Sequence, residues 1–570
     1  MPCASPCIPP DSMPPLALLV LMLANAPSAV TGAELPPVTP ERLVNGTDDP
    51  GHWLTYGGNY ANWRYTPLAR ITPENVARLA PTWVLQTGVE GQVANSPIVA
   101  DGTLYFTAAY NHLYALDAET GEQRWHYTHP MPSDLRLCCG PANRGVAIAG
   151  DRVFMATLDA RLLAFDRRSG NVLWNIAMDD YQRGYSATAA PLVVKDLVIV
   201  GSGGGEFSSR GFIDAYDAAT GRRRWRRYTV PAAGEPGAET WAGDSWKRGG
   251  APAWLTGTYD AENHVLYWST GNPSPLFNGD ARGGDNLYSN SILALDPDTG
   301  DLRWHFQATP HDVWDYDATN GIVLFDTDIA GQPRRVLAQP NRNGYLYLLD
   351  AATGAFLHGA RYVDKLNWST GLTAAGRPVV DPRYVPTAEG LQDFVCPGAL
   401  GGNNGSFTYA YSPRARTMYV PVIESCHAIT KEDAGDTPGE IAIGGSFGDT
   451  DADKGEAYGQ LVAIDPVSGE IRWKTRDAYP LVGGALATAG GLVFTGNQQG
   501  YALALDAAGG KVLWRFQMGA GMRSQPVTWE QGGRQYVAIG SGSGGAAVAL
   551  VGEPPLRGVG SALMVFSVPD

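Results

Sequence analysis

The chain has 570 residues and a formal net charge of −15. Its 70 Gly and 41 Pro make up roughly a fifth of the chain and only 17% of residues are charged, which excludes a coiled coil and an acidic disordered chain and favours many short strands joined by turns. The longest run of Lys or Arg is 222–224, so we expect no nucleic-acid binding. The acidity either steers a basic partner or only keeps the protein soluble.

The first feature along the chain is an apolar run, LALLVLMLANA, at residues 16–26. It has the length of a signal-peptide core and is too short to span a bilayer as a helix. The small residues 31–33 offer a cleavage site, so we expect a signal peptide over residues 1–33, with Met13 as an alternative start. The other interpretation of the run is a buried strand at the start of a domain. No other run is long enough to span a membrane, which predicts an exported, periplasmic protein.

Seven copies of one pattern follow, apolar-x-Asp-x-x-(Thr/Ser/Gly)-Gly-x-x-x-Trp. In each copy we expect a strand to end at the Asp, the Gly to supply a left-handed turn residue, and an outer strand to carry the Trp. The fifth copy has His in place of Trp. We interpret the Trp residues as plugs between repeats, not as a binding site. The copies lie at 115–125, 164–174, 215–225, 294–304, 348–358, 463–473 and 504–514.

The shorter spacings between copies are about 40–50 residues, the period of a four-stranded propeller blade. The longer spacings hold insertions, and the Gly- and Pro-rich stretch 364–404 is expected to form long loops. The C-terminal stretches SQPVTW, QYVAIGSG and ALMVFSV provide three strands without an outer one, whereas LAPTWVLQT at 79–87 provides an outer strand without a blade. Joining them makes an eighth blade and pairs the open edges of the ring. We therefore predict an all-β fold, one eight-bladed propeller over residues 34–570.

The chain has six cysteines. Two of them precede the expected cleavage site, and an even number of remaining cysteines in an exported chain favours disulfides. Cys138 and Cys139 are adjacent and can pair only by closing a small, strained ring. There is no Cys-x-x-Cys-His, so we expect no covalently attached haem. The six are Cys3, Cys7, Cys138, Cys139, Cys396 and Cys426.

Five polar segments interrupt the repeat, each next to a blade strand, so we expect their loops to converge at one end of the central channel. Glu206, Asp315 and Asp317 provide carboxylates and Asn272 an amide oxygen, and oxygen ligands select hard cations. Any one of these carboxylates taken alone is more often a turn cap. Trp254 is either a core residue or a surface on which a flat ligand stacks. The segments are 138–145, 201–207, 269–273, 309–317 and 339–344.

These segments resemble those of the pyrroloquinoline-quinone (PQQ) alcohol dehydrogenases, most closely the methanol dehydrogenase group. The resemblance is carried by the tandem Cys138-Cys139, the Asn-Arg-Gly at 143–145, the stretch 188–211, a Gly-Asn-Pro and a Trp-Asp-Tyr-Asp. It covers nearly all of the expected mature chain. It implies oxidation of an alcohol to an aldehyde by hydride transfer to metal-bound PQQ, with electrons passed singly to a separate soluble cytochrome c.

The resemblance also implies a role for each motif residue. A Cys138–Cys139 disulfide would cover one face of the PQQ ring and Trp254 the other. Asp315 would be the catalytic base, and Arg342 would contact the reactive quinone carbonyl. Further cofactor contacts would be Arg144, Thr188, Gly204, Gly205, Glu206 and Asn404; the metal ligands would include Glu206, Asn272 and Asp315; and Cys396 and Cys426 would form a structural disulfide.

The identity of the metal depends on Asp317. Side chains two positions apart in an extended segment point to the same side, so Asp315 and Asp317 can both reach one cation. With Glu206 they bring three negative charges, which a trivalent ion balances better than Ca²⁺. The resemblance agrees, because an Asp two residues after the base marks the lanthanide-dependent branch. We expect one lanthanide ion, with Ca²⁺ as the alternative; the other interpretation is that Asp317 caps a turn or faces water.

Four positions depart from the family pattern: Ala94, Pro252, Val482 and the Gly-Gly-Ala at 544–546. The last two reduce apolar groups that lie near the cofactor in the family, which suits a substrate wider than methanol, so we expect some small alcohol as the substrate. Two rival functions remain. A non-catalytic propeller scaffold explains the repeat but not the tandem cysteines, and a PQQ aldose dehydrogenase would share the cofactor but not these cysteines. The sequence leaves both a monomer and a homodimer open.

Overall fold

The computed structural model describes residues 35–46, 48–390, 394–405, 408–435, 437–450, 457–542 and 560–569. The expected signal peptide at 1–33 and the departure at 544–546 lie outside these residues. One compact unit begins at Pro36. Within the described part of the chain, none of the helices has the length and apolarity needed to cross a bilayer.

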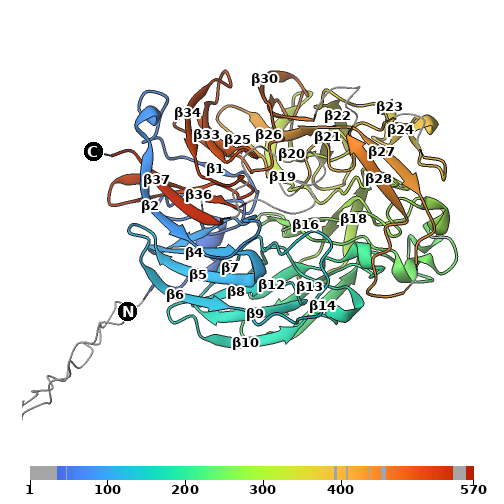
Figure 1. Ribbon diagram of the computed structural model, residues 1–570, viewed down its shortest axis with the longest axis horizontal. Helices are drawn as coiled ribbons and strands as arrows, with labels where there is room; N and C mark the ends of the chain where they lie inside the picture. The colour runs from blue at the N-terminus through green and yellow to red at the C-terminus, as the bar shows by residue number, and fades with distance from the viewer. Residues whose placement is uncertain are drawn as a thin grey trace, which may run out of the picture. The chain divides into compact units, whose positions relative to one another are not determined.

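The described strands form eight four-stranded antiparallel blades arranged in a ring, as predicted (Figure 1). The last strand of each motif copy lies at the rim, and the motif Asp ends or directly follows the third strand. Blades 1 to 4 are β3 (Ile98–Ala100), β4 (Thr103–Ala108), β5 (His112–Asp117) and β6 (Gln123–Thr128); β7 (Ala147–Ala149), β8 (Arg152–Ala156), β9 (Arg161–Asp166) and β10 (Val172–Ala177); β11 (Leu192–Val194), β12 (Leu197–Gly201), β13 (Phe212–Asp217) and β14 (Arg223–Tyr228); and β15 (Thr258–Asp260), β16 (Val265–Ser269), β17 (Ser291–Leu295) and β18 (Leu302–Gln307). Blades 5 to 7 are β19 (Val323–Ile329), β20 (Gln332–Pro340), β21 (Tyr345–Asp350) and β22 (Phe356–Arg361); β25 (Ala410–Ser412), β26 (Thr417–Glu424), β29 (Tyr458–Ile464) and β30 (Ile471–Asp477); and β31 (Leu486–Thr488), β32 (Leu492–Gly496), β33 (Tyr501–Asp506) and β34 (Val512–Gln517).

Blade 8 is built from both ends of the described chain. Its inner strands are β35 (Val527–Gln531), β36 (Arg534–Ser541) and β37 (Ala562–Ser567), and its outer strand is β2 (Ala80–Gln86). The antiparallel register places Ala80 opposite Ser567 and Gln86 opposite Ala562. In Figure 1 the blue β2 lies beside the red β37. The predicted closure of the ring by an N-terminal outer strand is therefore confirmed.

The motif Trp and Gly residues dock one blade on the next. Gly300 has φ +76°, and a Cβ atom placed on it would lie 2.6 Å from the ring of Trp225 in the preceding blade. The Nε1 of Trp225 donates a hydrogen bond to the carbonyl of Pro297 at 3.0 Å. His358, which replaces the Trp of the fifth copy, lies against Gly469 in the same way. The Trp–Gly pairs are Trp83–Gly121, Trp125–Gly170, Trp174–Gly221, Trp225–Gly300, Trp304–Gly354 and Trp473–Gly510.

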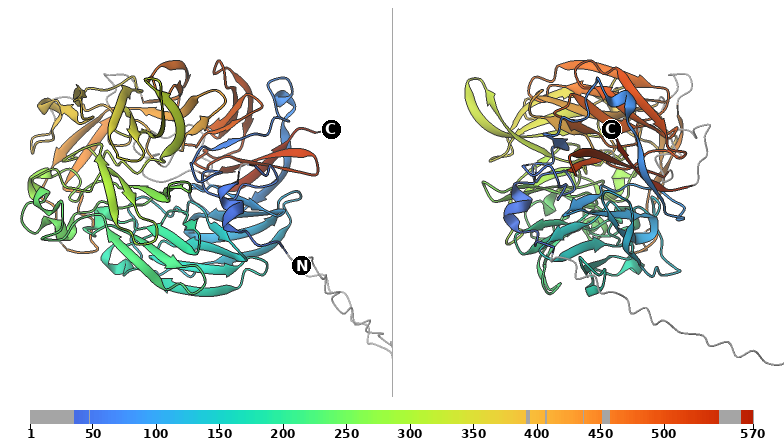
Figure 2. Two further views of the ribbon diagram at one scale, coloured as in Figure 1. Left: turned by 180° about the vertical axis from the view of Figure 1, so that it is seen from behind. Right: turned by 90° about the vertical axis from the view of Figure 1, so that its left-hand side faces the viewer.

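The N-terminal segment adds a short helix, α1 (Pro40–Val44), on the face seen from behind in Figure 2, and a strand, β1 (Tyr65–Thr66), that pairs in parallel with β31. Residues 56–66, here named the inner segment, bond to the first strands of successive blades. Arg64, which is fully buried, donates to the carbonyl oxygens of Tyr56 at 2.6 Å and Pro526 at 2.9 Å. The inner segment's carbonyl groups accept backbone hydrogen bonds from Tyr259 at 3.0 Å, Leu324 at 3.1 Å, Tyr411 at 2.7 Å and Ala487 at 3.0 Å.

The remaining described elements are insertions. The stretch expected to form long loops, 364–404, also contains a hairpin of β23 (Ser369–Leu372) and β24 (Pro378–Val380). A second hairpin, β27 (His427–Lys431) with β28 (Gly445–Thr450), interrupts blade 6. The Cys396–Cys426 disulfide joins these two insertions. The 3₁₀ helices are η1 (Val76–Arg78), η2 (Ala109–Asn111), η3 (Tyr181–Arg183), η4 (Gly205–Phe207), η5 (Ala238–Thr240), η6 (Ser245–Arg248), η7 (Gly279–Arg282) and η8 (Pro382–Tyr384).

Candidate active site

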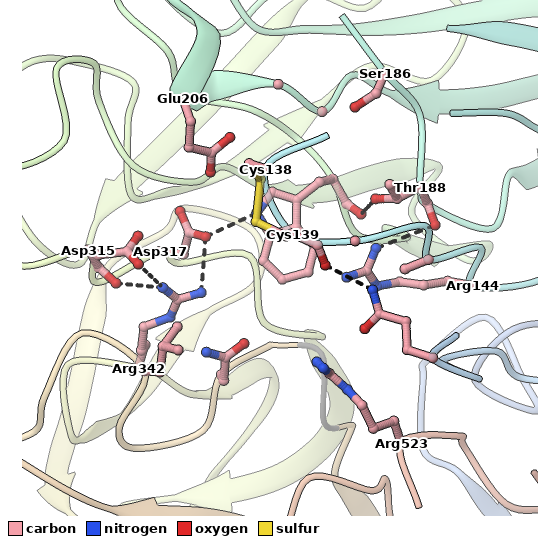
Figure 3. Close-up of a pocket in the computed structure, with 18 residues that line it drawn as sticks. Cys138, Cys139, Arg144, Ser186, Thr188, Glu206, Asp315, Asp317, Arg342 and Arg523 are labelled. Carbon is pink, nitrogen blue, oxygen red and sulfur yellow. Dashed lines mark hydrogen bonds and ion pairs between the residues drawn. A yellow bond between two sulfur atoms is a disulfide. The ribbon is translucent and has the colours of Figure 1, made fainter. Parts of the chain in front are cut away.

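Loops that lead into the blades line a cavity at the centre of the ring (Figure 3). Four of the five polar segments singled out in the sequence contribute to its wall. The lining residues are Gln92, Cys138, Cys139, Gly140, Ala142, Arg144, Ser186, Thr188, Gly203, Gly204, Glu206, Trp254, Asp315, Asp317, Arg342, Leu400, Asn404 and Arg523. The expected convergence of the loops is thus observed for the described residues.

Several lining residues occupy the same position relative to a blade. Arg144 lies three residues before the inner strand of blade 2, and Thr188, Trp254 and Arg523 lie four residues before the inner strands of blades 3, 4 and 8. Because the inner strands surround the central axis, the residue that precedes the strand by this interval faces the shared cavity in these four blades.

One side of the cavity carries the Cys138–Cys139 disulfide, which the structure contains. Both cysteines are exposed, and Gln92 Nε2 donates to the carbonyl of Cys139 at 2.9 Å. Among the described residues, Cys138, Cys139 and Glu206 are the only three potential metal-ligating side chains whose ligating atoms all lie within 4.8 Å of one another. The two sulfurs are bonded to each other, so this group is not itself a cation site.

Arg342 holds two carboxylates on the opposite side of Figure 3 from Arg144. Its Nη1 lies 3.1 Å from the carboxylate of Asp315 and its Nη2 lies 3.1 Å from that of Asp317. The guanidinium also donates to the backbone carbonyl of Asp315 at 2.6 Å. Arg342 and Asp317 are nearly fully buried, whereas Asp315 keeps some contact with solvent.

The turn that presents these carboxylates is shaped by Asp312, which is fully buried. Its two carboxylate oxygens accept the backbone N–H groups of Trp314 and Tyr316, each at 2.9 Å. Asp315, between them, has φ +68°. The expectation of an extended segment was therefore wrong at Asp315, because the hydrogen bonds to Asp312 bend the backbone there. Asp315 and Asp317 nevertheless both point toward the guanidinium of Arg342.

Asp317 also accepts hydrogen bonds from two residues besides Arg342. It accepts hydrogen bonds from Trp254 Nε1 at 3.0 Å and from the backbone N–H of Asn272. Asn272 is fully buried, and among the described residues its side-chain oxygen Oδ1 has no hydrogen-bond partner. A buried oxygen of this kind fits a cation ligand, because a cation would satisfy a lone pair that is otherwise costly to bury.

The crowded carboxylates have displaced pKa values. Burial, followed by the negative charge of Asp317, raises the pKa of Glu206 to about 7. Burial also raises the pKa of Asp315 well above its usual range, although Arg342 opposes the shift and Asp317 adds to it. The crowded carboxylates thus disfavour one another's ionisation, and a bound cation would favour the ionised forms.

The other end of the cavity carries Arg144, whose guanidinium lies 4.6 Å from the centre of the Trp254 ring. Its Nη1 lies 3.5 Å from the carbonyl oxygen of Thr188. Asn404 is buried, and its Nδ2 has no hydrogen-bond partner among the described residues. These donors and the flat Trp254 face fit a planar ligand that carries oxygen acceptors.

Two residues expected in the site lie behind the cavity wall. Gly205 is packed so closely on Pro252 that a Cβ atom would lie 2.6 Å from its ring, and Asn272 reaches the site through Asp317. Sequence reasoning missed Gln92, Ser186, Leu400 and Arg523, all of which line the cavity. Arg523 was detectable in principle, because its distance from the inner strand of blade 8 matches that of Thr188 and Trp254 in their blades.

Comparisons with known proteins agree on one family. The family model of the PQQ glucose/ethanol/alcohol dehydrogenase β-propeller domain matches residues 53–363 and 455–537. The quinoprotein alcohol dehydrogenase PedH of Pseudomonas putida is 39% identical over 97% of this chain and 96% of its own. The lanthanide-dependent methanol dehydrogenase of Methylacidiphilum fumariolicum is 36% identical, over 91% of this chain and 90% of its own. The solved structure of a europium-containing methanol dehydrogenase matches with a TM-score of 0.88 at 34% identity, covering 92% of this chain and 100% of the other.

Proposed function

This chain belongs to the family of PQQ-dependent alcohol dehydrogenases, and from that premise we propose that it is a periplasmic enzyme that oxidises a small alcohol to an aldehyde with one lanthanide ion beside PQQ. A soluble cytochrome c would accept the electrons, since the sequence contains no Cys-x-x-Cys-His for a haem of its own. Export would depend on a signal peptide at residues 1–33.

The cavity residues fit PQQ. The Cys138–Cys139 disulfide and the Trp254 ring would enclose the flat cofactor. Arg144 and Thr188 would bind its carboxylates. Gly204, Glu206, Arg342 and Asn404 would supply the further cofactor contacts. When bound, PQQ would supply an electrophilic carbonyl as the hydride acceptor, and a cation held by these residues would supply Lewis acidity.

Glu206, Asn272, Asp315 and Asp317 would hold the cation. The orphan oxygen of Asn272 and the excess of carboxylates over Arg342 support this assignment. Three carboxylates favour a trivalent ion over Ca²⁺, and two of the similar proteins carry lanthanide or europium in their names. In the structure Asp317 lies between Arg342, Trp254 and Asn272, which argues against a carboxylate that only faces water.

Asp315 would take the proton of the alcohol as general base. Its carboxylate faces the cavity, and Arg342 orients it through both the side chain and the backbone carbonyl. A positioned base contributes roughly 10²–10⁴-fold to the rate. Arg342, held by two carboxylates, keeps a charged donor at the reacting end of the cavity.

The observation that carries the proposal is the cluster of Asp315, Asp317 and Arg342 beside a buried, unpartnered Asn272 oxygen. The test is reconstitution of apoprotein with PQQ and either La³⁺ or Ca²⁺, assayed with an artificial acceptor on alcohols and on sugars. We expect La³⁺ to restore activity and Ca²⁺ to do so poorly. Asp317→Ala should lose the La³⁺ response while Asp326→Ala, at an exposed carboxylate on β19, keeps it.

Full activity with Ca²⁺ and no gain from La³⁺ would contradict the metal assignment and leave the PQQ assignment intact. Oxidation of sugars in preference to alcohols would instead favour the aldose dehydrogenase alternative.

A further inference from the structure

A third arginine faces the cavity besides Arg144 and Arg342. Arg523 lies in the loop that leads into blade 8, and its side chain is 5% exposed in total. Figure 3 shows its guanidinium pointing into the cavity from the side away from Glu206. Its place in blade 8 is equivalent to that of Thr188 in blade 3, so the fold itself presents this side chain to the occupant of the cavity.

The charges in the cavity are separated. Glu206, Asp315 and Asp317 gather with Arg342 at one end, whereas Arg144 and Arg523 lie away from them (Figure 3). Burial, followed by the positive charge of Arg144, lowers the pKa of Arg523 to about 10, so both guanidinium groups are charged at neutral pH and repel each other. An anion that enters between two buried like charges relieves this repulsion and replaces lost hydration.

A neutral donor lies in the same cavity wall. Asn404 is 4% exposed, and its Nδ2 has no hydrogen-bond partner among the described residues. A planar carboxylate matches the guanidinium groups of Arg144 and Arg523, because a guanidinium can bind both of its oxygens.

We propose that Arg523, together with Arg144, binds a carboxylate group of the molecule that occupies the cavity. The inference rests on the proposed function, since it assumes that PQQ and an alcohol enter this cavity. The carboxylate comes from one of two sources: PQQ, which carries three carboxylates, or an alcohol substrate that itself bears a carboxylate. In either case Arg523 supplies a charge-assisted hydrogen bond that a neutral residue cannot supply.

The experiment compares wild type with two neutral variants, Arg523→Met and Arg523→Gln, and with Arg523→Lys, which keeps the charge. Arg168→Met, which removes an exposed arginine from the rim turn of blade 2, is the matched control. Circular dichroism establishes which variants fold. Two neutral variants are made so that the test can still be carried out if one of them does not fold. The first arm titrates apoprotein with PQQ in the presence of La³⁺, following quenching of tryptophan fluorescence. The second arm measures KM for 1-butanol and for 4-hydroxybutanoate.

If Arg523 binds the cofactor, the neutral variants should raise the Kd for PQQ by at least about tenfold, with partial recovery in Arg523→Lys. If it binds a substrate carboxylate, the Kd for PQQ stays constant while KM for 4-hydroxybutanoate rises at least about tenfold relative to that for 1-butanol. Values in both arms within about twofold of the Arg168→Met control would overturn the inference. A wild type that takes up no PQQ would overturn the proposed function and this inference with it.

Discussion

At the scale of single residues, the geometry of the site depends on a carboxylate that is outside the cavity. Asp312 binds the N–H groups on either side of Asp315 and holds that residue at a φ that side-chain-bearing residues seldom adopt. The direction of the Asp315 and Asp317 carboxylates, and therefore their shared contact with Arg342, follows from this turn. Asp312 is a positioning residue and does not line the cavity.

Replacing Asp312 by Ala should therefore impair function more than stability. We expect kcat/KM to fall at least about tenfold and the affinity for La³⁺ to weaken, because Asp315 relaxes from its left-handed conformation. The control is Asp296→Ala. Asp296 also accepts two backbone N–H groups in a turn, at 2.9 and 3.2 Å, but lies in the outer turn of blade 4. Equal losses of La³⁺ affinity in the two variants would contradict the positioning role.

Trp254 combines two contacts that substitutions can separate. Its ring faces the cavity and its Nε1 donates to Asp317 at 3.0 Å. Trp254→Ala should raise the Kd for PQQ about two- to tenfold beyond the loss of buried area, since aromatic stacking contributes about 0.5–1.5 kcal/mol. Trp254→Phe keeps a flat face and should bind PQQ nearly as wild type does. PQQ titration of the apoproteins measures both, and an unchanged Kd in the Ala variant would remove Trp254 from the cofactor site.

Most of the cavity residues could be selected from the sequence, because the polar segments interrupt a regular repeat and the family resemblance added Thr188 and Asn404. Arg523 could not be selected in this way, since the segment 519–524 resembles an ordinary loop. The role of Arg523 becomes visible only from its distance to β35, which the structure defines. The bend at Asp315 was also beyond the sequence, because it depends on hydrogen bonds to Asp312 that compete with an extended backbone.

At the scale of elements, each motif copy contains the means of packing on its neighbour. The Asp side chain caps the turn, as Asp117 does for the N–H groups of Glu119 and Thr120 at 3.0 and 2.9 Å. The Gly accepts the Trp ring of the preceding blade on its open face. Turn and docking contact are thus encoded within eleven residues, which is why seven of the eight blades could be predicted from the repeat.

Gly300→Ala tests this docking. Gly300 has φ +76° and its Cβ atom would lie 2.6 Å from Trp225, whereas Gly331 has φ +79° with nothing within 4 Å. Gly331→Ala should cost about 1 kcal/mol of unfolding free energy through backbone strain alone, and Gly300→Ala about 2–4 kcal/mol, because overpacking against the indole adds to that strain. Denaturant unfolding compares the two, and equal losses would show that the indole contact contributes nothing.

The two disulfides should differ in their effects. Cys138 and Cys139 are exposed and adjacent, so replacing both by Ala should leave the melting temperature nearly unchanged while turnover falls. Cys396 and Cys426 are buried and lie 30 residues apart, so replacing both by Ala should cost about 2–4 kcal/mol. Calorimetry and steady-state assays measure these effects. Wild-type turnover without the Cys138–Cys139 bond would refute a functional role for that pair.

At the scale of the whole molecule, the inner segment links blades that are distant in the sequence. Arg64 is charged and fully buried, although burial lowers its pKa to about 10, and it donates to carbonyl groups from three parts of the chain. A guanidinium is suited to this place because its five donors radiate in one plane.

Arg64→Met should therefore cost about 3 kcal/mol or more of unfolding free energy, since it removes the side-chain donor to the buried carbonyls of Ala485 and Pro526 and leaves the carbonyl of Tyr56 with only the Ser96 hydroxyl. Arg414→Met is the control, because Arg414 is exposed and donates to a single carbonyl at 3.3 Å; it should change stability by less than about 0.5 kcal/mol. Chemical denaturation monitored by tryptophan fluorescence decides between them. A cost for Arg64→Met as small as that of the control would mean that the inner segment is held by its backbone alone.

The position of β2 has a consequence for how this protein folds during its synthesis. A ribosome makes residues 562–567 long after residues 80–86, yet these two stretches form one pair of neighbouring strands. The inner segment, residues 56–66, must likewise wait for the first strands of blades 4 to 7 before its carbonyl groups find their donors. A nascent chain that stops short of residue 562 therefore cannot seal its ring, and its unpaired β2 edge stays open to proteases and to other strands. Closure of the ring thus depends on synthesis having passed residue 567, because only then can β2 pair with β37.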